Sequence, residues 1–261
     1  ETSGSWIITL DADVRVGKKW LSSIAAFLVK YPEYVLLAGP VAYTEDRSYL
    51  SKFQQTDFLV MQGITGAMSY LQSGSLCNGA NLIYRRDAFE TVKGFQGNTH
   101  ISGGDDMFLH YKLMRQFPGR TTYFKCREAI AVTSAQPNIP AFLQQRIRWG
   151  AKVKYLQDKR MWPVLLLLFM VNLFFLVVFL YVFIYPSCFV WFLLAWLSKA
   201  LAEYRLLKTV NQFFQRQTPL RLFLFLQFLH IPYILFTGLL SLRGSYTWKG
   251  RKIRIHSNEA V

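Results

Sequence analysis

The chain has 261 residues, of which 52% are hydrophobic, and 30 lysine and arginine residues stand against 15 aspartate and glutamate residues. This length allows one or two domains, and the apolar fraction is too high for an ordinary soluble enzyme. A net charge of +15 beside long apolar runs favours a membrane surface first and an anionic substrate second. Nucleic acid is not expected as a partner, because no basic helix or aromatic RNA-binding signature is present.

The cysteine and histidine residues predict neither a disulfide framework nor a zinc site. The three cysteines are odd in number and far apart, which fits a reducing, cytosolic face. The four histidines form no ligand cluster and are expected to be structural or surface residues. Because the chain starts at Glu1 without a methionine and enters a core strand almost at once, we expect it to be the C-terminal part of a longer protein.

Apolar periodicity predicts an α/β arrangement for residues 1–140. Expected helices cover 17–30, about 49–71, a short stretch from Asp87, a stretch from Asp105 to Pro118, and one after Asn138. Expected strands cover 6–10, 35–41, part of 75–86, 121–124 and 129–133. A loop is expected between Gly97 and Gly104, directly before the acidic residues of the fourth helix.

The last hundred residues predict membrane helices. No charged residue occurs from 161 to 198, and a turn at 185–187 divides this run into spans of about 161–184 and 187–205. A third span is expected at 222–242, followed by a basic tail at 243–261. Basic residues in the interfacial stretch 141–160 place residues 1–160 on the cytosolic side of a plasma (inner) membrane. Three crossings would put the basic tail outside, so one segment is expected to be re-entrant or interfacial, and Pro232 favours the last.

Two carboxylates follow the first predicted strand. In an extended chain residues i and i+2 point to one side, so Asp11 and Asp13 are expected to face one target together. Ligands bind at the carboxyl ends of strands in α/β sheets, and two hard oxygen donors there suit Mg²⁺ or Mn²⁺ on a diphosphate. Taken alone, the pair is better explained as an acidic turn. The later motifs favour the metal.

A second acidic pair opens a predicted helix. Asp105 and Asp106 follow Gly104, and a carboxylate at a helix N-terminus stays ionised. Such a group can act as a general base when a substrate hydroxyl comes within hydrogen-bond reach. The alternative is that both acids only favour the helix dipole and cap the helix, which is common.

A third motif lies before the first membrane span. In a helix Gln145, Arg148 and Trp149 stand at i, i+3 and i+4, which is one face. Arg148 could clamp a phosphate with its planar guanidinium, and Trp149 offers a flat wall for a sugar or base. Arg146 is expected to point elsewhere, toward lipid headgroups. The alternative is an amphipathic interfacial helix, which is compatible with the first interpretation.

In their order along the chain these motifs resemble the processive-type family 2 glycosyltransferases, which include cellulose, hyaluronan and chitin synthases and ceramide glucosyltransferases. The motifs that carry the resemblance are Asp11-Ala12-Asp13, Gly79-Ala80-Asn81 with Arg85-Arg86, Gly94-Phe95, Gly104-Asp105-Asp106, Gln145-x-x-Arg148-Trp149 and the closing Trp248-Lys249-Gly250-Arg251. The Gly-Asp-Asp motif is nearer to hyaluronan-type enzymes than to cellulose synthases.

The resemblance implies a GT-A fold, which is Rossmann-like and binds a nucleotide-sugar, followed by transmembrane helices. Because the chain begins inside the nucleotide-binding sheet, we expect this fold to be partial. The implied activity is that of an inverting hexosyltransferase with a nucleotide-sugar donor, usually a UDP-sugar, and a Mg²⁺ or Mn²⁺ cofactor. The acceptor would be a glycan or a lipid, and membrane lipids would surround the enzyme.

The resemblance also implies roles for individual residues. On the donor side, Asp11 contacts the nucleotide, Asp13 with Asp11 binds the metal, and Arg148 with Gln145 holds the diphosphate. Asp106, or less favoured Asp105, is the base. Acceptor contacts are expected from Trp149, Gly79 and Asn81.

A non-catalytic alternative is a membrane scaffold or transporter component that keeps the fold. A transport path has little support, because the first span contains no charged residue and only His230 marks the last.

Overall fold

The computed structural model describes residues 3–97, 104–153, 158–243, 245–248 and 251–254. It divides into two compact units, Glu1–Gln136 with Tyr155–Lys159, and Pro137–Lys154 with Arg160–Val261. Most of the predicted loop between Gly97 and Gly104 lies outside the described residues, as does part of the closing basic motif.

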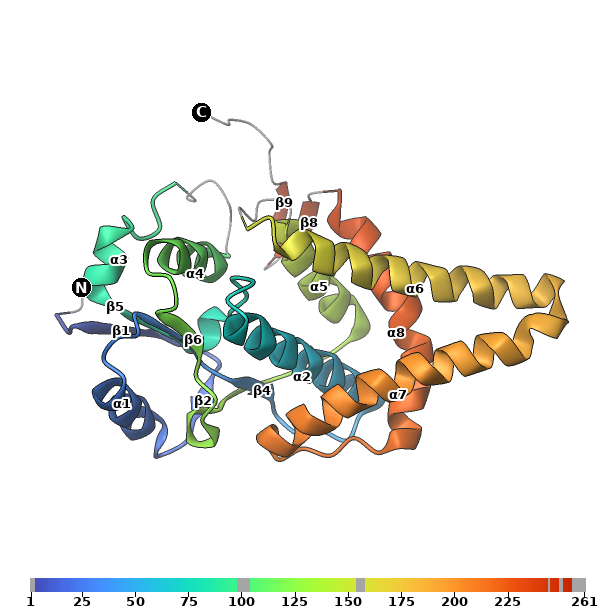
Figure 1. Cartoon of the computed structure of the whole chain (residues 1–261), viewed down its shortest axis with the longest axis horizontal. Coiled ribbons are helices and arrows are strands. Elements are labelled where there is room, and N and C mark those ends of the chain that lie inside the picture. Colours follow the sequence, from blue (N-terminus) through green and yellow to red (C-terminus); the bar gives the residue numbers. More distant parts are fainter. Residues whose placement is uncertain (1–2, 98–103, 154–157, 244, 249–250, 255–261) are drawn as a thin grey trace. The chain divides into compact units, whose positions relative to one another are not determined.

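Two mixed β-sheets form the centre of the first unit (Figure 1). One has the order β1-β5-β3-β6 and the other β2-β7-β4. Their bounds are β1 Trp6–Thr9, β2 Arg15–Val16, β3 Leu36–Ala38, β4 Val41–Tyr43, β5 Leu82–Arg85, β6 Thr121–Tyr123 and β7 Ala131–Thr133. Strand β5 pairs antiparallel with β1 and β3, whereas β3 with β6 and β4 with β7 are parallel. The α/β class predicted from the sequence agrees with this arrangement.

Helices pack on both faces of the four-stranded sheet. The helical elements are α1 Trp20–Lys30, α2 Tyr49–Tyr70, α3 Arg86–Thr91, α4 Asp105–Gln116 and the short 3₁₀ turns η1 Gly79–Asn81 and η2 Arg127–Ala129. Leu36 packs in one buried cluster with Leu109 of α4, and Leu37 packs in another with Ile24 of α1. Successive residues of a strand point to opposite faces, so the apolar run of β3 serves both layers.

The prediction of one continuous strand over 35–41 is wrong. The chain leaves β3 at Ala38 and enters β4, in the other sheet, at Val41. The Gly39 N–H donates to the Asn81 carbonyl oxygen over 2.8 Å, and Pro40 has no N–H with which to continue a ladder. This Gly-Pro step moves the chain between sheets, whereas the sequence indicated only a strand end.

The second unit is mainly helical. Its elements are α5 Ile139–Val153, α6 Met161–Ile184, η3 Pro186–Cys188, α7 Phe189–Phe214, α8 Leu220–Ser241 and the antiparallel strands β8 Ser245–Trp248 and β9 Arg251–Arg254. Helices α6 and α7 form a hairpin through η3 (Figure 1). By length and composition, α6 and α8 are the two helices in the described part that could cross a membrane. The predicted span 187–205 belongs to a longer helix, α7, which carries charged residues from Lys199 onward.

Candidate functional site

The carboxylate of Asp106 is held in a defined orientation at the start of α4. Its Oδ2 accepts a hydrogen bond from the backbone N–H of Gly79 over 2.7 Å, and its Oδ1 accepts from the N–H of Met107 over 2.9 Å. The helix begins after Gly104, whose φ of 90° is accessible to glycine. Asp106 is half-buried, whereas Asp105 is exposed. Of the two predicted acids, Asp106 is therefore the one that the fold orients.

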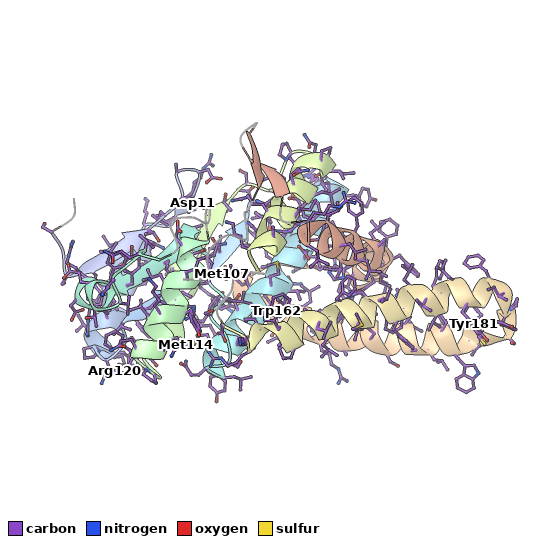
Figure 2. All side chains as sticks on the ribbon, turned by 90° about the horizontal axis from the view of Figure 1, so that it is seen from above. Asp11, Met107, Met114, Arg120, Trp162 and Tyr181 are labelled. Atoms are coloured by element: carbon purple, nitrogen blue, oxygen red, sulfur yellow. The ribbon has the colours of Figure 1, made fainter. Side chains whose placement is uncertain are left out.

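Gly79 joins the two acidic motifs. Its N–H bonds to Asp106, and its carbonyl oxygen accepts a hydrogen bond from the Thr9 hydroxyl over 3.0 Å. Thr9 is the last residue of β1, two positions before Asp11. The end of β1 and the start of α4 therefore both contact Gly79. Figure 2 labels Asp11 and Met107, the neighbour of Asp106.

The expected extended conformation after β1 is not observed. The Val14 N–H donates to the Asp11 carbonyl oxygen over 3.1 Å, so these residues form a turn in which both carboxylates are exposed. The Thr133 hydroxyl, at the end of β7, donates to Asp13 Oδ2 over 2.9 Å. The sequence offered no signal for this contact, because the two residues are 120 positions apart.

The oxygen donors at this turn fit a divalent cation on a diphosphate. Asp11 and Asp13 supply carboxylates, and Mg²⁺ is typically bound by one or two carboxylates plus substrate phosphates and water. Within the described ranges no group of three or more histidine, cysteine, aspartate or glutamate side chains could hold a metal. These residues therefore do not form a metal site made of protein side chains alone.

Asn81 lies inside the protein at the wall of this region. Its side chain is completely buried, and Nδ2 donates to the carbonyl oxygens of Pro40 and Ala129, each over 2.9 Å. These bonds tie the crossing between β3 and β4 to η2. The predicted acceptor contact would need a surface that Asn81 does not expose in this structure, whereas Gly79 is only partly buried.

Two further side chains lie near Asp106 and were not predicted as site residues. Burial, followed by the charge of Asp106, raises the pKa of the Cys77 thiol well above its usual range, so it stays protonated. His110, one turn after Asp106, is buried with Nε2 3.3 Å from the Thr121 hydroxyl. Burial lowers the pKa of His110 to about 4, against the raising effect of the backbone at 75–76 and of the Asp158 charge. His110 is therefore a neutral structural residue.

Helix α5, in the second unit, carries the third motif. Gln145, Arg148 and Trp149 are helical, with the spacing that the sequence predicted, and all three are half-buried. The expectation for Arg146 is wrong: its side chain is buried, and the guanidinium lies 4.3 Å from the centre of the Trp149 ring and 5.0 Å from that of Phe142. Positions 142, 146 and 149 share a helix face, and the cation stacks on both rings.

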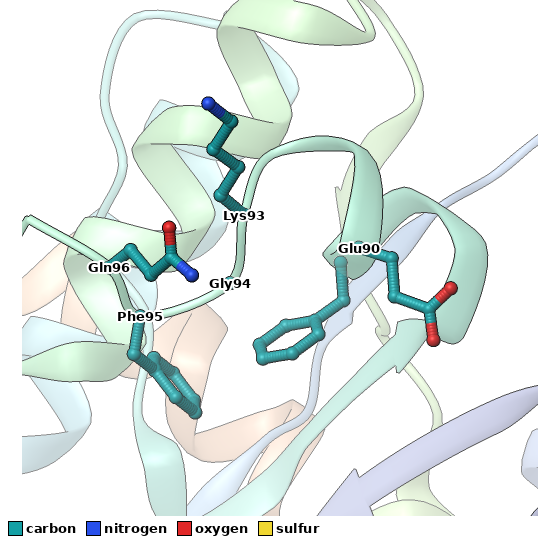
Figure 3. A pocket seen from close by; sticks show the side chains of 6 residues that line it. Glu90, Lys93, Gly94, Phe95 and Gln96 are labelled. Carbon is teal, nitrogen blue, oxygen red and sulfur yellow. The ribbon is translucent and has the colours of Figure 1, made fainter.

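A shallow hollow of about 640 Å³ lies beside the segment that follows α3 (Figure 3). Its lining residues are Phe89, Glu90, Lys93, Gly94, Phe95 and Gln96. Lys112 holds this segment by donating to the Gly94 and Gln96 carbonyl oxygens over 2.8 and 2.6 Å. The hollow follows the far end of β5, away from the end that pairs with Thr9, and it contains none of the predicted site residues.

Two comparisons with known proteins bear on this site. The family model described as glycosyl transferase family group 2 matches residues 6–203, which is more than half of the chain. The match includes both acidic motifs and the motif on α5. A search of curated proteins found no match.

Proposed function

The chain belongs to glycosyl transferase family group 2, and from that premise we propose that it moves a sugar from a nucleotide-sugar to an acceptor hydroxyl with inversion at the anomeric carbon. As a family 2 enzyme it is a glycosyltransferase. A UDP-sugar as the donor, a hexose as the transferred group and a GT-A fold are parts of the proposal.

One observation carries the proposal: Gly79 contacts both acidic motifs. Its N–H holds the Asp106 carboxylate, and its carbonyl oxygen is held by Thr9, directly before the turn with Asp11 and Asp13. A transferase of this kind needs a base near the acceptor and anionic donors near the diphosphate. The contacts of Gly79 support a common pocket for the two.

In the proposed reaction Asp106 takes the proton of the acceptor hydroxyl. The acceptor oxygen then bonds to the anomeric carbon while the bond from that carbon to the diphosphate oxygen breaks, and the nucleoside diphosphate leaves with the electron pair. One base suffices for this direct displacement, because a double displacement would need a second carboxylate as nucleophile. Two backbone N–H groups hold the Asp106 carboxylate and aim it.

For the remaining predicted residues we propose the roles that the resemblance to family 2 enzymes implies. Asp11 contacts the nucleotide, and with Asp13 it binds Mg²⁺ or Mn²⁺, which when bound offsets charge on the diphosphate. Arg148 and Gln145 hold the leaving diphosphate, since a planar guanidinium matches phosphate oxygens. Trp149 borders the acceptor.

Two acidic-motif neighbours complete the proposed pocket. Gly79 supplies backbone at the acceptor wall, next to Asp106. For Asn81 we propose a positioning role in place of acceptor contact, because its buried amide ties two loops of that wall together.

We place the reaction at the cytosolic face of a plasma (inner) membrane. Basic residues ahead of α6 favour that orientation under the positive-inside rule. The acceptor is either a growing glycan or a lipid, and the chain supports both equally.

The test uses the protein in its membrane with a radiolabelled UDP-sugar. Precipitable labelled polymer would identify a polysaccharide synthase, and label extracted into organic solvent would identify a lipid glycosyltransferase. Neither product with any UDP-sugar, in membranes where the donor binds, would contradict transfer and favour the non-catalytic scaffold.

A further inference from the structure

The end of α8 lies against α5, the helix that precedes the first apolar helix. The Ser241 hydroxyl is 3.3 Å from the Ile147 carbonyl oxygen. Leu240 packs on Ile147 and Ala151, and the Tyr233 ring stacks on Phe142 with centroids 5.2 Å apart. A side chain at position 150 would overlap Ser241, so the two helices approach closely. The second half of α8 is therefore packed along α5.

This contact constrains how the chain can pass through a membrane. Helix α5 ends at Val153, and α6 begins at Met161, so α6 starts on the side of the membrane on which α5 lies. Helices α6 and α7 are antiparallel arms of one hairpin, so α7 returns toward that side (Figure 1). Since α8 then ends against α5, it adds no net crossing.

The apolar residues of α8 have partners within the second unit. Ile231 and Leu235 share a buried cluster with Phe175 of α6 and with Phe192 and Trp196 of α7. The rings of Trp196 and Phe228 are stacked with centroids 4.4 Å apart. A larger part of α8 than of α6 is buried: 33% of the most apolar stretch of α8, against 11% of that of α6. Packing on the hairpin thus accounts for an apolar helix that composition alone would assign to a membrane crossing.

A closed polar cluster marks the place where α8 passes α7. Lys199 Nζ lies 2.8 Å from Glu203 Oε1 and donates to Gln227 Oε1 over 2.9 Å, and Gln227 Nε2 donates to Glu203 Oε2 over 2.7 Å. The cluster has no net charge, and each member bonds to the other two. Such pairing is the usual state of ionisable groups close to hydrocarbon.

Beyond this cluster the hairpin tip has large apolar side chains directed outward. Phe183, Ile184 and Trp191 are 73%, 70% and 73% exposed. Figure 2 shows Tyr181 at the end of the hairpin away from Trp162. Exposed apolar residues on both arms of a helical hairpin fit the acyl chains of a bilayer, which offer no hydrogen bonds.

We infer that the α6–α7 hairpin inserts its tip into the lipid bilayer, that α8 lies across the base of the hairpin without a net crossing, and that residues before Met161 and after Leu242 are on one side of the membrane. This resolves the conflict between three apolar segments and a basic tail. The inference does not depend on the proposed sugar transfer.

The test is cysteine labelling of the full-length protein in sealed vesicles with a membrane-impermeant maleimide. Cys77, Cys126 and Cys188 are the free cysteines of this chain, and their replacement gives a background for Lys159→Cys before α6 and Arg243→Cys after α8. Both positions are exposed. We expect both to be labelled from the same face of the vesicle. Labelling of the two from opposite faces would overturn the inference.

The hairpin tip is tested with the native Cys188, kept as the only cysteine. From the face that labels Lys159→Cys, we expect at least a tenfold slower reaction at Cys188, with full reaction after detergent is added. Reaction at Cys188 as fast as at Arg243→Cys in intact vesicles would exclude insertion. Equal labelling of all three variants in detergent verifies that each cysteine is reachable in the folded protein.

Discussion

The Oδ2 atom of Asp106 accepts a hydrogen bond from the backbone N–H of Gly79 over 2.7 Å, and the same glycine accepts one from Thr9 through its carbonyl oxygen. A side-chain carboxylate that is held by backbone N–H groups keeps one direction, although it loses its own rotamer freedom. The proposed base is therefore oriented by Gly79, which Thr9 ties to the end of the strand that leads to the donor-side acids.

Replacing Asp106 with asparagine should abolish transfer while the fold persists. Asn keeps an oxygen for the Gly79 N–H but cannot take the acceptor proton, so we expect a loss of at least about 100-fold in kcat. Sugar transfer and donor binding should be measured in parallel, with donor affinity unchanged.

Asp105→Asn is the matched control, because Asp105 is its exposed neighbour. It should retain activity within about threefold of the wild type, which is well below the effect of losing a general base. Equal losses in the two variants would contradict the assignment of the base to Asp106.

Two glycine-to-alanine changes should differ in their effect on stability, because one position is tightly packed and the other has room for a methyl group. A Cβ on Gly39 would lie 2.6 Å from Asn81 Oδ1 inside the core, whereas one on Gly79 would meet Asp106 at an ordinary 3.4 Å. Gly39→Ala should lower the free energy of unfolding by about 1–3 kcal/mol, as overpacking does. Gly79→Ala should change it by less than about 0.5 kcal/mol. Denaturant unfolding measures both, and similar values for the two would argue against the packing described for Asn81.

His110 should make the protein less stable as pH falls. Its pKa is lowered to about 4 in the folded state from a usual 6.5, so the unfolded chain takes up a proton first. The stability due to the neutral imidazole is complete above pH 6.5 and is lost progressively as pH falls toward 4. A shift of this size corresponds to about 3 kcal/mol.

Unfolding at several pH values tests this, with His110→Gln as the comparison. The variant should be less stable at neutral pH and should have a weaker pH dependence between about 6.5 and 4. A wild type and variant with parallel pH profiles would exclude His110 as the source.

Asp13 and Thr133 should affect metal use more than acceptor use. Asp13→Asn should raise the Mn²⁺ or Mg²⁺ concentration for half-maximal transfer by more than tenfold. Thr133→Val removes the hydroxyl that orients Asp13, and loss of such an outer partner typically costs about 10–100-fold in metal affinity. Activity should disappear with chelator and return with metal. A changed acceptor KM with unchanged metal dependence would contradict this arrangement.

The polar cluster between α7 and α8 should contribute to the stability of the second unit. Gln227→Leu removes both bonds between the helices, and we expect a loss of about 1–3 kcal/mol, because buried groups lose their partner. Thr209→Val is the control, since its hydroxyl bonds only within α7. Thermal unfolding in detergent should show a lower midpoint for Gln227→Leu alone.

Local signals in the sequence were sufficient for most elements. The strand before Asp11, the helix opened by Asp105 and the helix with Trp149 follow from apolar periodicity, charge at a helix start and Gly or Pro at the ends. These signals depend on residues a few positions apart, so they can be recognised in the sequence without knowledge of tertiary contacts. The resemblance to family 2 enzymes also rested on short motifs in their order along the chain.

The conformation of the acidic turn and the partners of its residues were not accessible in this way. The turn at Asp11, the bond from Thr133 to Asp13 and the burial of Arg146 against Trp149 each correct or extend what the pattern indicated. Spacing along the chain carries no information about a partner 120 positions away.

By itself, the sequence determined the α/β class, the acidic motifs and the apolar helices, because these depend on residue type and short-range periodicity. The tertiary structure decided that Gly79 joins the two acidic motifs and that α8 packs back onto α5. Those relationships arise from packing between segments that are distant in the sequence. Several tertiary arrangements are compatible with the same local pattern, and one close backbone approach or one buried hydrogen bond selects among them.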